Sequence, residues 1–416
     1  MRQLRVWLNE QPVGLLREQD NLWQFAYEPG WLAAPDGFDL APQLPRASGE
    51  IHDGGSQRPV QWFFDNLLPE EQARSLLAQD ARVDVADAFA LLAYYGAESA
   101  GALTLLPPEQ PLPGGGLQPL PSAELARRID NLPRVSLGHS APKRMSLAGA
   151  QHKLALVLQA GELYEPLGQE PSTHILKPDH PEREHYPHSA ANEWFVMRLA
   201  AAVKLPVPAV ELRQVPHSVY LVERFDRQQI GGRLQRRHVL DACQLLSLDR
   251  TYKYRMATLE TLQRLVELCR SKALSRQALL RWALFNALLG NNDAHLKNLS
   301  FFVGAHGIEL TPHYDLLSTS VYARDNGWGT AELSWPMGNA RRFAELTRAD
   351  VLAFGAVLGL PASVATRQLD GLLSKLPGAA DQLLEQALQH GLSAGEMRLL
   401  RQIRHGVLAD MLRQLG

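Results

Sequence analysis

Asn291-Asn-Asp-Ala-His-Leu-Lys-Asn298 is the most informative stretch in this chain of 416 residues. It follows a predicted apolar helix that begins with Ser275 as its cap and ends at Gly290, a residue type favoured just past a last helical turn. Within the stretch, Asp293 and Asn298 have the D-x-x-x-x-N spacing of a kinase catalytic loop. In such a loop the carboxylate accepts or orients the proton of an attacking hydroxyl, and the amide oxygen helps to hold Mg²⁺.

The spacing by itself also fits an ordinary polar turn, because Asn and Asp are common after helices. A second acidic position follows in Thr311-Pro-His-Tyr-Asp315, after an apolar stretch (299–303) and a turn. Kinases have a hairpin-like segment of this kind before their metal-binding aspartate, so Asp315 is the expected second Mg²⁺ ligand. Seen alone, Asp315 would be a turn or cap residue. Lys297 could add positive charge at the transferred group.

Upstream, Lys177 ends a predicted strand (173–177) and Glu193 lies on the predicted helix 190–205. Kinases pair a strand lysine with a helix glutamate to fix the charge on the α- and β-phosphates. Each residue could instead be a solvated surface charge, and that is the expectation for Glu193.

A second candidate segment, Arg144 to Lys153, precedes a predicted hairpin (153–158 and 162–165). Its small residues would let backbone N–H groups approach phosphates. It is neither G-x-G-x-x-G nor a Walker A motif, so a plain loop is the alternative. Glu223-Arg-Phe-Asp226 leaves a predicted strand (218–222) and would form the hinge between lobes, where backbone groups usually bind adenine.

Composition limits the class of protein. Hydrophobic residues make up 45% and charged residues 21%, which excludes a mainly disordered chain. The formal net charge of −2 gives no global electrostatic footprint for nucleic acid. The only two cysteines, Cys243 and Cys269, exclude a disulfide framework and favour a reducing, cytoplasmic compartment. The chain has neither a signal-peptide h-region nor an apolar run of about 18 residues, so no membrane association is expected.

The element pattern predicts three parts. An N-terminal third of mixed α/β character begins with a hairpin (5–16) and ends at a proline- and glycine-rich linker (107–121). A small sheet with one helix follows, and from Asp241 onward the pattern is almost entirely helical. Capping boxes are expected at Thr347 with Asp350 and at Ser393 with Glu396.

Motifs in the same order resemble those of the HipA family of bacterial toxin kinases. Ser146-Leu-Ala-Gly-Ala-Gln-His-Lys153 is similar to the family's S-[VL]-A-G-A-Q-x-K. The later motifs that resemble the family are Thr173-His-Ile-Leu-Lys177, Glu223-Arg-Phe-Asp-Arg227, Asp293-Ala-His-Leu-Lys-Asn298 and His313-Tyr-Asp315. Two N-terminal segments, 63–69 and 96–107, also resemble it, so the resemblance covers nearly the whole chain.

The resemblance implies an α+β, two-lobed, kinase-like fold. It implies an N-terminal α/β module (1–120), a small β-rich lobe with the phosphate loop (121–240) and a large helical lobe with the catalytic loop (241–416). It also assigns roles: Asp293 as catalytic base, Asn298 and Asp315 as Mg²⁺ ligands, and Ser146 as an autophosphorylated serine. The residues that it implies for ATP binding are Ala148, Gly149, Ala150, Gln151, His152, Lys153, Lys177, Glu223, Arg224, Phe225, His295, Leu296 and Lys297.

The same resemblance implies a Mg-ATP-dependent serine/threonine kinase that is the toxin of a toxin–antitoxin pair. Its partner would be a helix-turn-helix antitoxin resembling HipB, which would make most of the contacts with operator DNA. Family members phosphorylate an aminoacyl-tRNA synthetase, and the synthetase class is the expectation here. Two alternatives stay open: a kinase of small molecules or lipids, and a catalytically silent co-repressor that only binds the antitoxin.

Two positions depart from the family pattern. His152 stands where the best-known member has an acidic residue, and Asn292 stands where it has threonine. Neither departure touches an expected catalytic group, so they concern substrate choice more than chemistry. The basic run Arg233 to His238 is expected to be a solvated loop rather than a DNA contact.

Overall fold

The computed structural model describes residues 1–323 and 327–416. These residues form two compact units, each assembled from segments that are distant in sequence. Unit 1 comprises Met1–Pro181, Leu221–Tyr252 and Ser300–Ile308, and unit 2 comprises Glu182–Tyr220, Lys253–Leu299 and Glu309–Gly416. The expected domains (1–120, 121–240 and 241–416) are each one continuous segment of the chain. That division stays a prediction.

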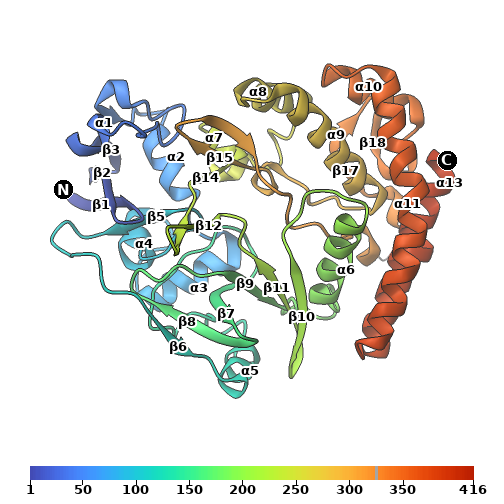
Figure 1. The fold of residues 1–416 in the computed structure, drawn as a ribbon, viewed down its shortest axis with the longest axis horizontal. Coiled ribbons are helices and arrows are strands. Elements are labelled where there is room, and N and C mark those ends of the chain that lie inside the picture. Colours follow the sequence, from blue (N-terminus) through green and yellow to red (C-terminus); the bar gives the residue numbers. More distant parts are fainter. Residues whose placement is uncertain (324–326) are drawn as a thin grey trace. The chain divides into compact units, whose positions relative to one another are not determined.

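Unit 1 begins with an antiparallel sheet in the order β4-β3-β2-β1-β5. Its strands are β1 (Arg2–Leu8), β2 (Gln11–Gln19), β3 (Leu22–Tyr27), β4 (Glu50–His52) and β5 (Leu103–Leu106). Figure 1 labels β1, β2, β3 and β5 of this sheet. The β1–β2 pairing confirms the hairpin predicted at the N-terminus. Asn9 in its tight turn has a φ of 54°, a left-handed conformation that Asn adopts more readily than most residues. β5 pairs with β1, so residues near 100 return to the start of the chain.

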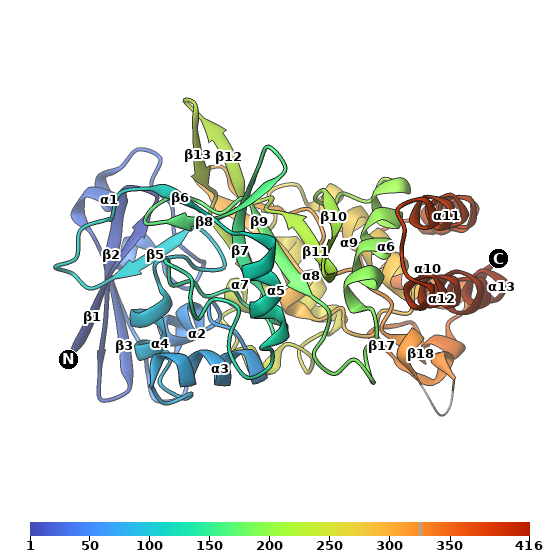
Figure 2. The ribbon, with the colours of Figure 1, turned by 90° about the horizontal axis from the view of Figure 1, so that it is seen from below.

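Helices lie beside this sheet (Figure 2), and aromatic side chains join the two. Phe25 of β3 contacts Phe64 with ring centroids 5.7 Å apart, and Trp23 contacts Phe89 at 5.2 Å. Each such ring buries roughly 150–250 Å², so these contacts dominate the local core. The helices are α1 (Pro29–Ala33), α2 (Pro59–Asp65), α3 (Glu71–Ala81) and α4 (Ala88–Tyr95).

A second sheet in unit 1 carries several candidate site residues. β9 (His174–Pro178), β7 (Leu154–Gln159), β8 (Glu162–Leu167) and β6 (Gly116–Pro119) are consecutive neighbours, and β11 (His217–Glu223) adjoins β9. The predicted hairpin and the predicted strand before Pro178 are therefore confirmed. The linker segment was not expected to hold a strand, yet β6 pairs with β8 and α5 (Ser122–Asp130) follows it. Backbone pairing at a sheet edge needs no apolar alternation, so composition could not reveal β6.

The remaining strands of unit 1 come from later in the chain. β12 (Arg227–Ile230) and β13 (Arg233–Arg236) form a hairpin, and β14 (Val239–Asp241), which precedes α7 (Ala242–Leu245), pairs with β15 (Ser300–Gly304). The solvated loop expected at 233–238 is therefore wrong in part. Arg233 is exposed, but Arg236 and His238 are only 6% and 5% exposed. Arg236 is the last residue of β13, and His238, between β13 and β14, is held inside by a hydrogen bond between its Nε2 and the Leu40 carbonyl.

Unit 2 is mostly helical. Its core includes Trp282 and Phe285 of α9 (Lys272–Leu288), both fully buried. The helix starts one turn before the predicted cap, so Ser275 lies inside it. The other helices are α6 (Ser189–Ala202), α8 (Leu259–Leu268), α10 (Arg348–Val357), α11 (Ala362–Gln389), α12 (Ala394–Gln402) and α13 (Ala409–Leu415). The capping boxes at Thr347 and Ser393 are confirmed.

Strands also occur after Asp241, so the expectation of an almost entirely helical region was wrong. β16 (Gly307–Leu310) follows β15, and β17 (Glu332–Met337) and β18 (Ala340–Arg342) form a hairpin in unit 2. The three residues of β18 are too few to give a periodic signal. In the part of the chain that the structure describes, no helix is long and apolar enough to cross a membrane.

Candidate active site

The loop that carries Asp293 begins where α9 ends in unit 2. Gly290 has a φ of 65°, and a Cβ atom built on it would lie 2.7 Å from Val407 and 3.0 Å from Ser320. Glycine is therefore required by both the backbone conformation and the close packing. This confirms Gly290 as the residue that ends the helix and starts the loop.

Hydrogen bonds of short polar side chains hold the loop backbone. The Asn291 side chain donates to Asn286 Oδ1 at 2.7 Å and accepts from the backbone N–H of Asp293 at 3.0 Å. The Ser334 hydroxyl, from β17, accepts from the Ala294 N–H and donates to the Asn291 carbonyl. The backbone at Asp293 is thus fixed from two sides, while its carboxylate is only partly buried.

Tyr254 contacts the Asp293 carboxylate directly, and no pattern in the sequence predicted this contact. The Tyr254 hydroxyl donates to Asp293 Oδ1 at 2.5 Å, and its ring meets the His295 ring edge-on with centroids 4.9 Å apart. Tyr254 is 53% exposed. A residue 39 positions upstream therefore orients one oxygen of the expected catalytic base.

The loop that carries Asp293 and the segment that ends at Asp315 contact each other in unit 2. The Asn298 amide donates to the backbone carbonyl of Asp293 at 3.0 Å, so the first and last residues of the D-x-x-x-x-N motif are bonded to each other. The Tyr314 hydroxyl donates to the Lys297 carbonyl at 2.7 Å, so the segment ending at Asp315 lies against the same loop. Asp315 has a φ of 52°, a strained conformation for a non-glycine residue that clusters at functional sites.

Glu193 lies in the interior of unit 2. It is 3% exposed on α6, so the expectation of a solvated surface charge was wrong. Most residues of α6 are buried, on every side of the helix. The charge of Glu193 alone therefore could not predict whether its side chain is exposed. Burial raises the pKa of Tyr220 well above its ordinary value, and the carboxylates of Glu193 and Asp315 raise it further. Tyr220, Glu193 and Asp315 therefore lie within electrostatic reach of one another.

Asn298 and Asp315 have the chemistry of a Mg²⁺ site. Mg²⁺ prefers oxygen ligands and is usually bound through one or two carboxylates, retained waters and substrate phosphates. Because the Asn298 nitrogen is engaged by the Asp293 carbonyl, its amide oxygen is the atom left for a cation. One amide oxygen and one carboxylate oxygen are ligands that suit a Mg²⁺ ion bound together with substrate phosphates. Among residues 1–323 and 327–416, no group of three His, Cys, Asp or Glu side chains forms a closed metal cage.

In unit 1, Gly149 and Lys153 shape the expected phosphate loop. Gly149 has a φ of 106°, and a Cβ atom there would lie 2.7 Å from Lys153 Nζ. Lys153 Nζ donates to the Ala148 carbonyl at 2.9 Å, closing the loop on itself. The backbone N–H of Glu70 donates to the Gly149 carbonyl at 3.1 Å, so the N-terminal segment fastens the loop.

Ser146 is held by the same N-terminal region. Its side chain is fully buried, and its hydroxyl is 3.4 Å from the Leu67 carbonyl. Its backbone N–H donates to the Glu98 carbonyl at 2.9 Å. Two N-terminal segments therefore hold the serine and the loop in place, 63–69 and 96–107. Both resemble the family, and the sequence alone suggested no role for them.

Other expected ATP-binding residues of unit 1 lie around this loop. Gln151, His152 and Lys153 line a cavity of about 50 Å³ together with Lys143. Burial, followed by the proximity of His180, lowers the pKa of His152 below its ordinary value. Lys177 is 5% exposed on β9. Ala148 and Ala150 are partly buried in the loop.

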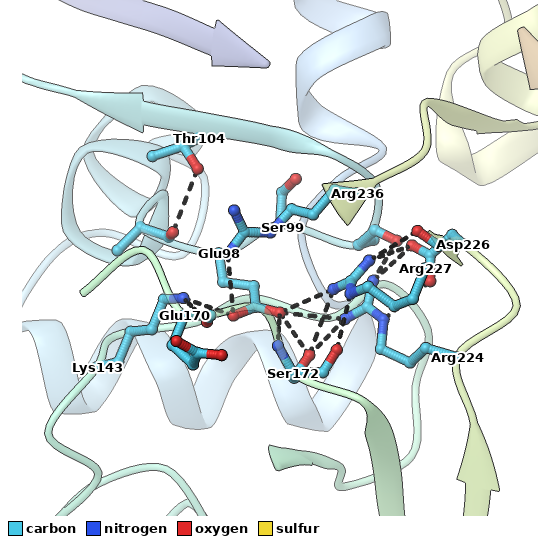
Figure 3. Close-up of polar contacts among 12 residues, drawn as sticks. Glu98, Ser99, Thr104, Lys143, Glu170, Ser172, Arg224, Asp226, Arg227 and Arg236 are labelled. Atoms are coloured by element: carbon cyan, nitrogen blue, oxygen red, sulfur yellow. Dashed lines mark hydrogen bonds and ion pairs between the residues drawn. The ribbon is translucent and has the colours of Figure 1, made fainter. Parts of the chain in front are cut away.

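Glu223, Arg224 and Phe225 face three different surroundings. Glu223 is exposed at the end of β11, and the Phe225 ring contacts Phe302 at 6.0 Å. The Arg224 side chain turns into a buried ionic cluster, where it donates twice to Asp226 (Figure 3). The side chain of Arg224 is therefore engaged by Asp226, and only the backbone of Arg224 is left to bind a ligand. In unit 2, His295, Leu296 and Lys297 are all buried around the short helical turn η3 (Leu296–Asn298).

Comparison with known proteins gives a consistent result. Residues 4–106 match the family described as HipA N-terminal domain, and residues 145–380 match the family described as HipA-like C-terminal domain. The chain is 36% identical over 400 residues to Y4mE of Sinorhizobium fredii, covering 92% of each protein. It is 31% identical over 367 residues to the serine/threonine-protein kinase toxin HipA of Shewanella oneidensis, covering 84% of this chain and 81% of that protein.

A solved structure agrees over the whole chain. The structure of the Shewanella oneidensis toxin–antitoxin complex of HipA, HipB and operator DNA contains a chain with a TM-score of 0.82 and 29% identity. The match covers 99% of this chain and 97% of the other. The predicted α+β, kinase-like fold is therefore confirmed.

Proposed function

Because this chain belongs to the HipA family of serine/threonine-protein kinase toxins, we propose that Asp293 is the general base of its phosphoryl transfer. Kinase homology implies that the chain uses ATP. The γ-phosphoryl group of ATP would pass to a serine or threonine hydroxyl of a protein, the hydroxyl proton would pass to Asp293, and ADP would leave.

The arrangement of unit 2 supports these roles. Asn298 and Asp315 would hold Mg²⁺, which neutralises charge on the transferred phosphoryl group. The observation that carries the proposal is the pair of hydrogen bonds from Asn298 to Asp293 and from Tyr314 to Lys297. These bonds support the proposal because they hold the D-x-x-x-x-N loop against the segment that ends at Asp315, a contact that an ordinary polar turn would not need.

In unit 1, the loop Ala148 to Lys153 would bind the ATP phosphates through backbone N–H groups. The positive φ of Gly149 supports this, because glycine lets backbone approach a phosphate closely. Lys177 would add charge at the phosphates, and the backbone of Glu223 to Phe225 would meet adenine. His295, Leu296 and Lys297 would complete nucleotide binding.

Ser146 would be an autophosphorylation site that switches the kinase off. A phosphoserine carries about −1.5 to −2 charges at pH 7, which would repel the phosphates of ATP in the neighbouring loop. Ser146 is fully buried, so its segment must leave its present place before the hydroxyl can react. Autophosphorylation should therefore be slow compared with phosphorylation of an exposed serine.

We further propose a partner and a substrate class. The Shewanella oneidensis HipA was solved with HipB and operator DNA, which supports a HipB-like helix-turn-helix antitoxin for this toxin. The DNA contact would be mostly indirect, consistent with the net charge of −2. The substrate would be an aminoacyl-tRNA synthetase in the cytoplasm, by analogy with the family.

The test is mass spectrometry of purified protein after incubation with Mg-ATP. Wild type should acquire phosphate on Ser146, and Asp293→Asn should not, whereas the exposed control Asp130→Asn should behave as wild type. ATP binding in calorimetry without any phosphoprotein would favour a small-molecule kinase. Absence of both ATP binding and phosphoryl transfer would favour a silent antitoxin-binding co-repressor and contradict the kinase proposal.

A further inference from the structure

A buried ionic cluster surrounds Glu98 in unit 1 (Figure 3). Glu98 lies between α4 and β5, and the other members come from segments up to 138 positions away. We call it the Glu98 cluster; it comprises Glu98, Lys143, Ser172, Arg224, Asp226, Arg227 and Arg236.

The Glu98 carboxylate is the centre of the contacts. One oxygen accepts from Lys143 Nζ at 2.7 Å, and the other accepts from the Ser172 hydroxyl at 2.5 Å and from Arg227 at 2.9 Å. Arg224 lies 3.5 Å and Arg236 3.7 Å from it. A single carboxylate thus faces four cationic side chains.

The cluster carries more positive than negative charge. Arg224 and Arg227 also share Asp226, at 2.7 and 3.0 Å. Within the described part of the chain, the four cations of the cluster therefore face two carboxylates, an excess of two positive charges. All of these side chains are between 1% and 7% exposed. Burying charge without a counter-charge is costly, because little water remains to solvate it.

Two members show the effect of this excess. Burial and then the neighbouring Arg224 lower the pKa of Arg227 to about 10. Arg236 donates to the Gln169 carbonyl at 3.1 Å, but its Nε finds no acceptor among residues 1–323 and 327–416. A buried guanidinium N–H without an acceptor points to an anionic group that is not part of the resting protein.

The chain offers such a group next to the cluster. Ser146 is bonded through its backbone to Glu98, and Lys143 precedes it by three residues. Lys143 also lines the cavity of about 50 Å³ that Gln151 and Lys153 of the phosphate loop line. A phosphoryl group on Ser146 would thus be joined to a residue whose backbone contacts Glu98 and which follows Lys143 by only three positions.

We propose that the Glu98 cluster is a binding site for a phosphate-type dianion, with Arg236 and Lys143 as its principal donors. The dianion has two possible sources, a phosphoryl group on Ser146 or free inorganic phosphate. The first source rests on the proposed autophosphorylation and deepens it, because a phosphoserine held by the cluster would keep the phosphate loop from returning to ATP. The charge of such a group, about −2, matches the excess of the cluster.

The first test measures the phosphate itself in the full-length chain. Phosphoserine is placed at position 146 during translation with an expanded genetic code, so the result does not depend on kinase activity. Its second pKa, followed by ³¹P NMR, should fall from about 6 to about 5 or below, because nearby cations favour the dianion. Arg236→Gln should return the pKa towards about 6. Arg233→Gln, a matched change on the same strand at a side chain that is 78% exposed, should not.

The second test uses unmodified protein and inorganic phosphate without nucleotide. Calorimetry should show saturable binding to wild type that weakens at least tenfold in Arg236→Gln or, if that variant does not fold, in Lys143→Gln. A lowered phosphoserine pKa that depends on Arg236 identifies Ser146 as the source, and binding of inorganic phosphate alone identifies the free ion. A phosphoserine pKa of about 6 together with no phosphate binding overturns the site, as does a lowered pKa that Arg236→Gln leaves unchanged.

Discussion

At the scale of single residues, the sequence motifs indicate the residues with expected chemistry but not the side chains that contact them. The motif residues Asp293, Asn298 and Asp315 could be singled out from sequence because their spacing reflects one loop and one following segment, and their roles stay predictions. Tyr254 and Glu98 could not, because their partners lie 39 or more positions away and only the folded chain brings them into contact. Glu193 was misjudged for the same reason, since its burial depends on tertiary packing.

Replacing Tyr254 with Phe should lower the rate of phosphoryl transfer about three- to tenfold. The hydroxyl orients one carboxylate oxygen of Asp293, and losing a hydrogen bond worth about 1 kcal/mol corresponds to roughly fivefold in rate. Stability should change little, because Tyr254 is 53% exposed. Steady-state kinetics with a peptide substrate would show the loss in kcat with an unchanged KM for ATP. The matched control is Tyr252→Phe, and an equal loss there would contradict the prediction.

His238 should make stability depend on pH. Burial lowers its pKa from 6.5 to about 4, and the neutral ring donates Nε2–H to the Leu40 carbonyl. The unfolded chain therefore binds a proton that the folded chain does not, and stability falls as pH drops from about 6.5 towards 4. For this one histidine, the free energy of unfolding should fall by up to about 1.4 kcal/mol for each pH unit in that range.

Urea unfolding of wild type and His238→Gln between pH 7 and pH 5 would measure this dependence. The variant keeps an N–H donor but does not titrate, so its stability should fall less steeply by about that amount. The exposed His405→Gln should follow wild type. Parallel curves for wild type and His238→Gln would refute the assignment.

Elements with local signals were predictable. The hairpins at the N-terminus and at β7–β8, the strand β9 and the two capping boxes all depend on residues within a few positions of one another. β6 and β18 were missed because their pairing partners, rather than their own residues, make them strands. The start of α9 was placed one turn late, since helix boundaries depend on which of several polar residues becomes the cap.

The phosphate loop should tolerate no side chain at Gly149. Gly149→Ala would place a Cβ 2.7 Å from Lys153 Nζ in a backbone conformation with φ of 106°. We expect ATP affinity to fall at least tenfold and stability to fall by about 1 kcal/mol. Gly161→Ala is the matched control, because its φ is 88° but no atom lies within 4 Å of the added Cβ. It should cost similar stability while keeping ATP affinity in calorimetry, and equal affinity for both variants would refute the role of the loop.

At the scale of the molecule, the resemblance over nearly the whole chain correctly predicted the family and the fold class. It could not predict the discontinuous composition of the two units. Unit 1 takes in residues 221–252 and 300–308, and sequence order hides such returns of the chain. The substrate, the antitoxin and the site roles stay predictions, because they depend on molecules outside the chain.

Glu98 should be a main determinant of the stability of unit 1. Glu98→Gln leaves four buried cations with one carboxylate, and breaking a buried ion pair from one side costs about 3–5 kcal/mol. Urea unfolding followed by the fluorescence of the unit 1 tryptophans should show this loss. The exposed control Glu109→Gln should leave the transition unchanged. A loss below about 1 kcal/mol would mean that the cluster is hydrated.

The close packing of Gly290 against Val407 has a consequence for biosynthesis. A ribosome releases the N-terminus first, so residues 1–236, which contain every member of the Glu98 cluster and the segment that buries Ser146, emerge before the Asp293 loop exists. That loop is packed at its first glycine only when the segment Ile403–Leu408, more than 100 positions after Asp293, has also been made. A chain that stops between these two segments is therefore expected to lack a packed catalytic loop and to be harmless to the cell that makes it.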